Sequence, residues 1–151
     1  MPDTEQNENN PENKPYRIID HTADIGIEAD GDSLEQAFEH VALGMFETIS
    51  DGSEVEILTT VSVKAEAEDL EELLVNYLTE LLYLYDVEGV LFGEFEVEIF
   101  ELGGSYELEG EARGEMFIVG KHNYPIEIKA VTYHMLEVKE TPPYVRVIFD
   151  L

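Results

Sequence analysis

The chain contains 151 residues, of which 44% are hydrophobic and 10% aromatic, and this composition suits one folded domain with its own core. Thirty-five acidic residues against eight basic ones give a formal net charge of −27. Such a surface repels phosphate backbones, since affinity for nucleic acid depends on Lys and Arg displacing counterions. We therefore expect no direct nucleic-acid binding, and we expect cations or a basic protein as partners. The simpler interpretation, that the acidic excess only keeps the protein soluble, stays open.

The chain has no cysteine, which excludes disulfides, zinc–thiolate sites and thiol nucleophiles. Residues 1–15 are rich in Asn, Glu and Pro and predict a disordered acidic leader, followed by a folded domain over residues 16–151. The leader lacks the basic and apolar regions of a signal peptide, and no apolar run reaches the ~18 residues of a membrane span. We therefore expect a cytoplasmic protein that makes no contact with a membrane.

The first half of the domain predicts two strands, a helix, a strand and a second helix. Apolar residues recur with a helical period over residues 34–49, and Ser33 with Gln36 fits a capping box, with Asp32 and Glu35 as a competing register. The second helix begins after Asp69 and ends at Gly89. The predicted strands of this half, marked by β-prone or alternating apolar residues, cover residues 16–19, 25–29 and 55–65.

The second half predicts only strands. Gly103-Gly104 is a hairpin signal, and residues 114–125 lose periodicity and predict a loop. Alternating apolar residues mark strands over residues 94–99, 106–112, 126–132 and 145–149. The element order is ββαβα followed by about five strands, which is not the βαβ alternation of a doubly wound fold. We expect an α+β domain in which two helices pack on a largely antiparallel sheet.

The most unusual segment is Asp20-His21-Thr22-Ala23-Asp24, which places two carboxylates and an imidazole between apolar runs. At the other end of the sequence, Asp150 follows an apolar strand and Leu151 adds a terminal carboxylate. Asp24, Asp150 and this carboxylate could together supply three oxygen groups, which favour Ca²⁺, Mg²⁺ or Mn²⁺ over zinc. On residues alone, Asp20 could equally be a turn cap and Asp150 a frayed end.

Four histidines are further candidates. His21 and His134 each lie at the edge of a predicted strand, where an imidazole could orient a carboxylate or carry a proton. His40 falls on the polar side of the first helix, and His122 falls in the predicted loop. For each of them a structural role with satisfied hydrogen bonds is the simpler interpretation.

Five segments, taken in order, resemble the archease family, and together they span most of the chain from Tyr16 onward. They are Asp20-His21-Thr22-Ala23-Asp24-Ile25-Gly26, Gly31-Asp32-Ser33-Leu34-Glu35-Gln36-Ala37-Phe38, Leu84-Tyr85-Asp86-Val87-Glu88-Gly89, Lys129-Ala130-Val131-Thr132-Tyr133-His134 and Val147-Ile148-Phe149-Asp150-Leu151. The acidic leader is not part of the pattern, and the segment from Gly114 to Pro125 matches it less clearly.

The resemblance implies an accessory protein of tRNA splicing that promotes guanylylation and repeated turnover of an RtcB-type RNA ligase. It does not join RNA itself, so we expect no catalytic residues. The resemblance also implies a divalent cation, calcium first with Mg²⁺ or Mn²⁺ as alternatives, on Asp24, Asp150 and Leu151. Asp20, His21, Lys129 and His134 are expected to support the site or contact the partner.

Three alternatives make different predictions. A chaperone-like modulator of a tRNA-modifying cytosine methyltransferase would change methylation specificity without a metal. An independent metal-dependent hydrolase using Asp24, Asp150 and His21 or His134 would cleave a phosphoester without a partner. A purely structural acidic module would tolerate the loss of both aspartates.

Overall fold

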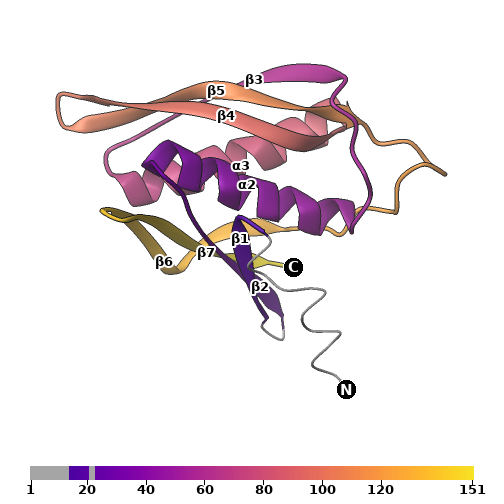
Figure 1. Cartoon of the computed structure of the whole chain (residues 1–151), viewed down its shortest axis with the longest axis horizontal. Helices are drawn as coiled ribbons and strands as arrows, with labels where there is room; N and C mark the ends of the chain where they lie inside the picture. The colour runs from indigo at the N-terminus through magenta and orange to yellow at the C-terminus, as the bar shows by residue number, and fades with distance from the viewer. Residues whose placement is uncertain (1–13, 21–22) are drawn as a thin grey trace.

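The computed structural model describes residues 14–20 and 23–151, in which two helices lie between two antiparallel sheets (Figure 1). The helices are α2 (Leu34–Ser50) and α3 (Leu70–Glu88). The strands are β1 (Tyr16–Asp20), β2 (Asp24–Asp30), β3 (Thr59–Ala67), β4 (Val90–Leu102), β5 (Ser105–Met116), β6 (Ala130–Glu140) and β7 (Pro143–Asp150). The expected α+β class is confirmed, with four strands after α3 where the sequence predicted about five.

Both helices begin and end where the sequence predicts. Ser33 is the N-cap of α2 and its hydroxyl accepts a hydrogen bond from Gln36 N at 3.1 Å, so the register with Ser33 and Gln36 is the one adopted. Asp69 caps α3 in the same way through Glu72 N at 2.7 Å. Gly89 ends α3 at φ 71°, a left-handed conformation that glycine adopts without steric cost.

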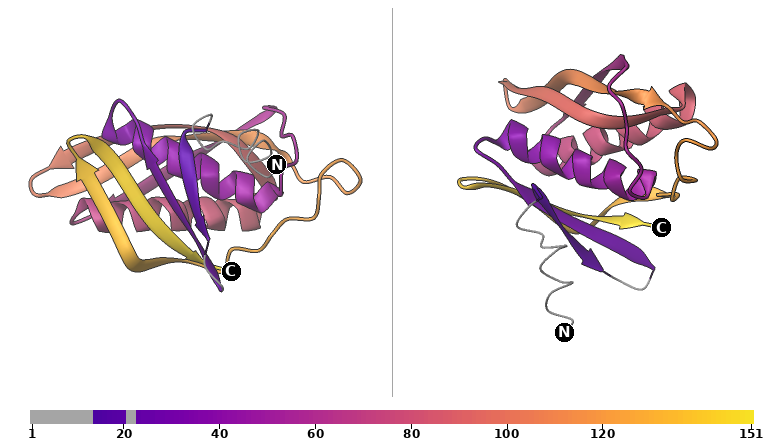
Figure 2. Two further views of the ribbon diagram at one scale, coloured as in Figure 1. Left: turned by 60° about the horizontal axis from the view of Figure 1, so that its bottom comes forward. Right: turned by 45° about the vertical axis from the view of Figure 1, so that its right-hand side comes forward.

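The seven strands form two separate sheets. One has the strand order β1-β2-β7-β6 and the other β3-β5-β4, all paired antiparallel. The turn between β4 and β5 is formed by Gly103 and Gly104, both at positive φ, as the hairpin signal predicts. The four-stranded sheet buries one face against the helices, while its other face lies on the outside of the layered molecule (Figure 2).

The starts of two predicted strands are wrong, and three strands extend further than predicted: β4 begins at Val90, β5 ends at Met116 and β6 ends at Glu140. Residues 126–129 are not part of β6, because Ile126 N donates to Ile49 O at the end of α2 instead of joining a ladder. Residues 55–58 precede β3, and Val55 and Ile57 lie over Gly93. Apolar alternation in both segments therefore does not mark a strand, and Ile57 and Ile126 are 41% and 38% exposed. The predicted loop is also shorter at its start, since β5 continues to Met116.

The exposed edge of β4 is covered by carboxylates of α2. Glu39 accepts a hydrogen bond from Val97 N at 2.9 Å, and Glu35 accepts a longer one from Ile99 N at 3.4 Å. Edge strands with unpaired amides invite pairing with other chains, and these contacts occupy two of them. In the part of the chain that the structure describes, no helix is long and apolar enough to cross a membrane.

Candidate functional site

The two aspartates singled out in the sequence meet in space. Strands β2 and β7 pair with Asp24 directly opposite Asp150, although the two residues lie at opposite ends of the folded domain in sequence. Directly opposed residues of an antiparallel pair project to the same face with Cβ atoms roughly 5 Å apart. The neighbouring pair, Ile25 with Phe149, is buried in the core beneath α2. Because side chains alternate along a strand, Asp24 and Asp150 face the outside of the sheet.

Backbone contacts fix the end of the chain at this place. Leu151 N donates to Ala23 O at 3.4 Å, and Lys129 N donates to Asp150 O at 2.8 Å. Ala130, the first residue of β6, also pairs with Asp150. Asp150 is therefore held between its neighbours on both sides and is not a frayed end. We call Asp24, Asp150 and Leu151 the acidic tip.

Two arginines lie near Glu28, at the end of the sheet face that is remote from the acidic tip. Arg17 Nε donates to Glu28 Oε1 at 2.8 Å and Tyr144 OH donates to Glu28 Oε2 at 2.9 Å. The hydrogen bond from Arg17 lowers the pKa of Glu28 below its usual range. Arg146 lies directly opposite Glu28 on β7. Arg17 thus compensates carboxylates at the end of this face that is remote from Asp24 and Asp150.

The oxygen donors at the acidic tip are carboxylates. Among the residues that the structure describes, no group of three or more Asp, Glu or His side chains is arranged to hold a metal. A cation at the acidic tip would therefore rely on the two aspartates together with the main-chain carboxylate of Leu151. Asp24 is half-buried, whereas Asp150 and Leu151 are exposed, so such a cation would remain accessible from solvent. Carboxylate oxygens of this kind suit Ca²⁺ or Mg²⁺.

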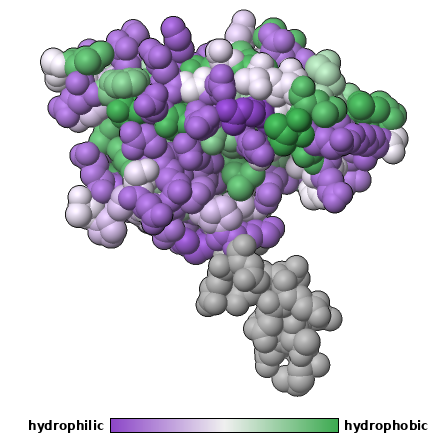
Figure 3. Space-filling view, turned by 45° about the horizontal axis from the view of Figure 1, so that its top comes forward, coloured by the Kyte–Doolittle hydropathy of each residue, from purple (hydrophilic) through white to green (hydrophobic). Residues whose placement is uncertain are grey.

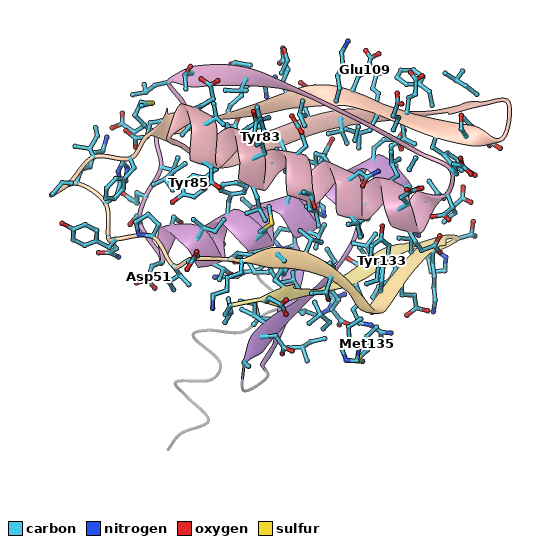
Figure 4. The ribbon with its side chains drawn as sticks, turned by 180° about the vertical axis from the view of Figure 1, so that it is seen from behind. Asp51, Tyr83, Tyr85, Glu109, Tyr133 and Met135 are labelled. Atoms are coloured by element: carbon cyan, nitrogen blue, oxygen red, sulfur yellow. The ribbon has the colours of Figure 1, made fainter. Side chains whose placement is uncertain are left out.

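The supporting residues are only partly brought to this place. Lys129 is exposed beside Ala130, and its main chain is bound to Asp150. His134 is exposed where the pairing of β6 with β7 shifts register between Thr132 and Glu137, and its amide donates to Thr132 Oγ1 at 3.3 Å. In the same irregular stretch Met135 has φ 54° and projects away from the helices (Figure 4). The side chain of Asp20 and the whole of His21 lie outside the described residues.

The sequence missed one buried ionic network. Glu115 is 2% exposed and accepts hydrogen bonds from Glu56 N at 2.8 Å, Lys121 Nζ at 2.7 Å and His122 Nε2 at 3.0 Å. His122 Nδ1 accepts from Ile118 N at 3.0 Å, so the imidazole carries its proton on Nε2. The only sequence signal for this network is the pair Lys121-His122 inside a segment without periodicity.

Comparison with known proteins decides the family. The model of the Archease protein family (MTH1598/TM1083) matches residues 16–151. The chain belongs to the archease family. It is 47% identical over 129 residues to "Protein archease" of Pyrococcus furiosus, covering 85% of this chain and 91% of that protein. Over 143 residues it is 37% identical to "Protein archease" of Danio rerio, covering 93% and 88%.

A solved structure supports the same assignment. The solution structure of Methanobacterium thermoautotrophicum protein 1598 matches with a TM-score of 0.79 and 40% identity, covering 91% of this chain and 99% of that one. The family resemblance and the α+β fold predicted from the sequence are thus confirmed. The archease family is linked to tRNA splicing, which indicates a tRNA-processing accessory protein.

Proposed function

We infer that this archease-family chain activates an RtcB-type RNA ligase by promoting its guanylylation, so that the ligase turns over repeatedly in tRNA splicing. The observation that carries this proposal is the direct pairing of Asp24 with Asp150 at the ends of the two central strands of the four-stranded sheet. Membership of the archease family supports the assignment to tRNA splicing. The net charge of −27 supports a protein partner with a basic surface.

The acidic tip would act where the ligase binds GTP and RNA ends, which requires a cationic active site. Asp24, Asp150 and Leu151 would hold a divalent cation, calcium first, and Lys129 would keep Asp150 in place through its main chain. When bound, such a cation can balance the charge of phosphate oxygens. The contribution of this chain is to hold paired carboxylates in a fixed, solvent-accessible position before the partner arrives.

Charge removal at the acidic tip tests the proposal. Asp24→Asn and Asp150→Asn keep the side-chain shape and remove one negative charge each. We expect either change to slow ligase guanylylation by at least about tenfold, as loss of groups that hold or orient a metal usually does. The rate is followed as transfer of labelled GMP to the ligase with GTP and a divalent ion present.

Asp30→Asn is the matched control, since Asp30 lies at the far end of the same strand and is exposed. It should leave the rate within about twofold of wild type, as expected of a surface position away from the site. Wild-type rates in both the Asp24 and the Asp150 variants would remove the acidic tip from the function. Calcium titration by calorimetry, with Asp150→Asn for comparison, tests the cation separately.

A further inference from the structure

Large hydrophobic side chains are exposed together at one end of the molecule. Figure 3 shows hydrophobic residues gathered at the end where the segment after β5 projects. The most exposed are Tyr124 at 74%, Leu58 at 70% and Val119 at 68%. We call the following set the apolar end: Leu58, Val87, Met116, Ile118, Val119 and Tyr124. Single exposed hydrophobic residues are common, but a gathered group of this size is typical of an interaction surface.

These residues come from neighbouring segments. Phe117 N donates to Gly89 O at 3.0 Å, which joins the segment after β5 to the end of α3. Leu58 N donates to Gly114 O at 2.9 Å, which places Leu58 beside the end of β5. The rings of Phe117 and Tyr124 lie 5.9 Å apart. Contacts between the segments thus make the apolar end one surface.

The projecting segment is held in a defined shape. The buried carboxylate of Glu115 binds Lys121 and His122, and His122 in turn binds the amide of Ile118. Asn123 N donates to Ser53 Oγ at 2.8 Å and Ile126 N donates to Ile49 O at 2.9 Å. Val119 and Tyr124 are therefore displayed on a segment fixed from within on both sides. A surface that is ordered before binding loses less conformational entropy on association.

A short segment of the chain connects the apolar end with the acidic tip. From Tyr124 the chain runs to Lys129, whose amide binds Asp150, and Figure 2 shows this segment arriving beside the C-terminus. Five extended residues span at most about 18 Å. A standard protein interface buries roughly 800 Å² on each partner, so one footprint can cover both places.

The charge near the apolar end indicates which kind of partner can bind there. Exposed acidic residues lie within a few positions of the apolar end in the sequence, namely Glu54, Glu56, Asp86, Glu88 and Glu127, of which Glu56 pairs with Lys121. A second copy would bring the same acidic residues and another net charge of −27 into contact, which opposes self-association. A partner with an apolar patch surrounded by Lys and Arg is complementary to this surface in both hydrophobicity and charge.

We propose that the apolar end is the anchoring part of the surface that binds the RNA ligase, while the acidic tip acts on guanylylation. This inference rests on the proposed function for the identity of the partner. The division of roles predicts that the apolar end governs affinity, mainly through the rate of dissociation. The acidic tip governs the rate once the complex has formed.

The test is a double variant, Val119→Ser with Tyr124→Ser, which replaces two exposed side chains. We expect the Kd for a purified RtcB-type ligase to rise at least about tenfold, as for loss of an aromatic anchor. With the variant at saturation, guanylylation should return to within about twofold of the wild-type rate, because the acidic tip is intact. Leu58→Ser, on a separate segment, gives an independent second measurement.

Phe100→Ser with Leu102→Ser is the matched control. These residues are 40% and 53% exposed on the β4–β5 hairpin, which lies at the opposite end of the molecule in Figure 1. The control should bind like wild type. An unchanged Kd in both the double variant and Leu58→Ser would overturn the proposal that the apolar end anchors the complex. An equal rise of the Kd in the control pair would overturn it as well.

Failure of the proposed function gives a different result. If the wild type binds the ligase through the apolar end without raising the rate of guanylylation, the docking surface is supported and the proposed activation fails. If sedimentation shows a dimer of the wild type that the double variant disrupts while its Kd for the ligase is unchanged, the occupant is a second copy and the inference is overturned.

Discussion

At the scale of single residues, the hydroxyl of Tyr77 is a polar group buried in the core. The side chain is fully buried and stacks on Phe38 with ring centroids 6.0 Å apart. Its hydroxyl has no hydrogen-bond partner among the described residues, and burial raises its pKa well above the usual range. A buried hydroxyl without a partner retains its desolvation cost.

We therefore expect Tyr77→Phe to raise the free energy of unfolding by about 1 kcal/mol, measured by urea denaturation. Tyr16→Phe is the natural comparison, because Tyr16 OH donates to a carboxylate oxygen of Glu47. That change should lower stability by about 1 kcal/mol. A loss of stability in Tyr77→Phe would show that the hydroxyl contributes a bond in solution.

The meeting of distant residues could be predicted where the sequence is unusual and not where it is common. Asp24 and Asp150 stood out because each follows or precedes an apolar run, and β2 and β7 pair them directly. Glu115 is one of 35 acidic residues and is the second-last residue of β5, a strand with no unusual sequence feature. Its burial depends on Lys121 and His122 folding back over it, and such a contact leaves no periodic pattern in the sequence.

At the scale of elements, the segment from Phe117 to Lys129 depends on the ionised form of Glu115. The amide of Glu56 and the ammonium of Lys121 hold the pKa of Glu115 at about 2, compared with 4.5 for an unperturbed glutamate. A carboxyl with a lowered pKa in the folded state stabilises that state fully above its unfolded pKa. The contribution is lost as the pH falls from about 4.5 toward 2.

Glu115→Gln removes this titration. We expect the variant to lose about 2 kcal/mol near neutral pH, since the hydrogen bonds it weakens involve a charged acceptor. The difference in unfolding free energy between wild type and variant should shrink as the pH approaches 2. Denaturant titrations at several pH values measure it. A difference that stays constant across this range would show that Glu115 is not the titrating group.

Elements with their own capping signals were predicted well, and elements defined only by contact with others were not. Ser33, Asp69 and Gly89 mark helix ends through local hydrogen bonds and backbone conformation, which the sequence specifies directly. The segments around Val55 and Ile126 alternate like strands but lie outside β3 and β6, and Ile57 and Ile126 are 41% and 38% exposed. Alternation of apolar residues therefore does not show whether a neighbouring strand is present.

At the scale of the whole molecule, the sequence did not predict that the two helices lie between two sheets. A helix buried on two sides needs apolar residues on more than one face, and α2 buries Gly44 against Tyr16 and Ile27 as well as Phe46 against Phe92. These contacts involve strands of both sheets. Periodicity predicted the core-facing stripe correctly but could not separate one sheet from two.

The last prediction concerns the net charge of −27, which acts on the folded state as a whole. Mutual repulsion between carboxylates destabilises a compact chain, and salt shortens its range from about 30 Å at 0.01 M to about 3 Å at 1 M. We expect Tm to rise by several degrees with NaCl across this range, since about 1 kcal/mol corresponds to roughly 2–4 °C for a domain of this size. CaCl₂ at equal ionic strength should raise Tm further in wild type than in Asp150→Asn, because a cation bound at the acidic tip stabilises only the folded chain. A Tm that falls with NaCl would instead show that surface ion pairs, such as Arg17 with Glu28, outweigh the repulsion.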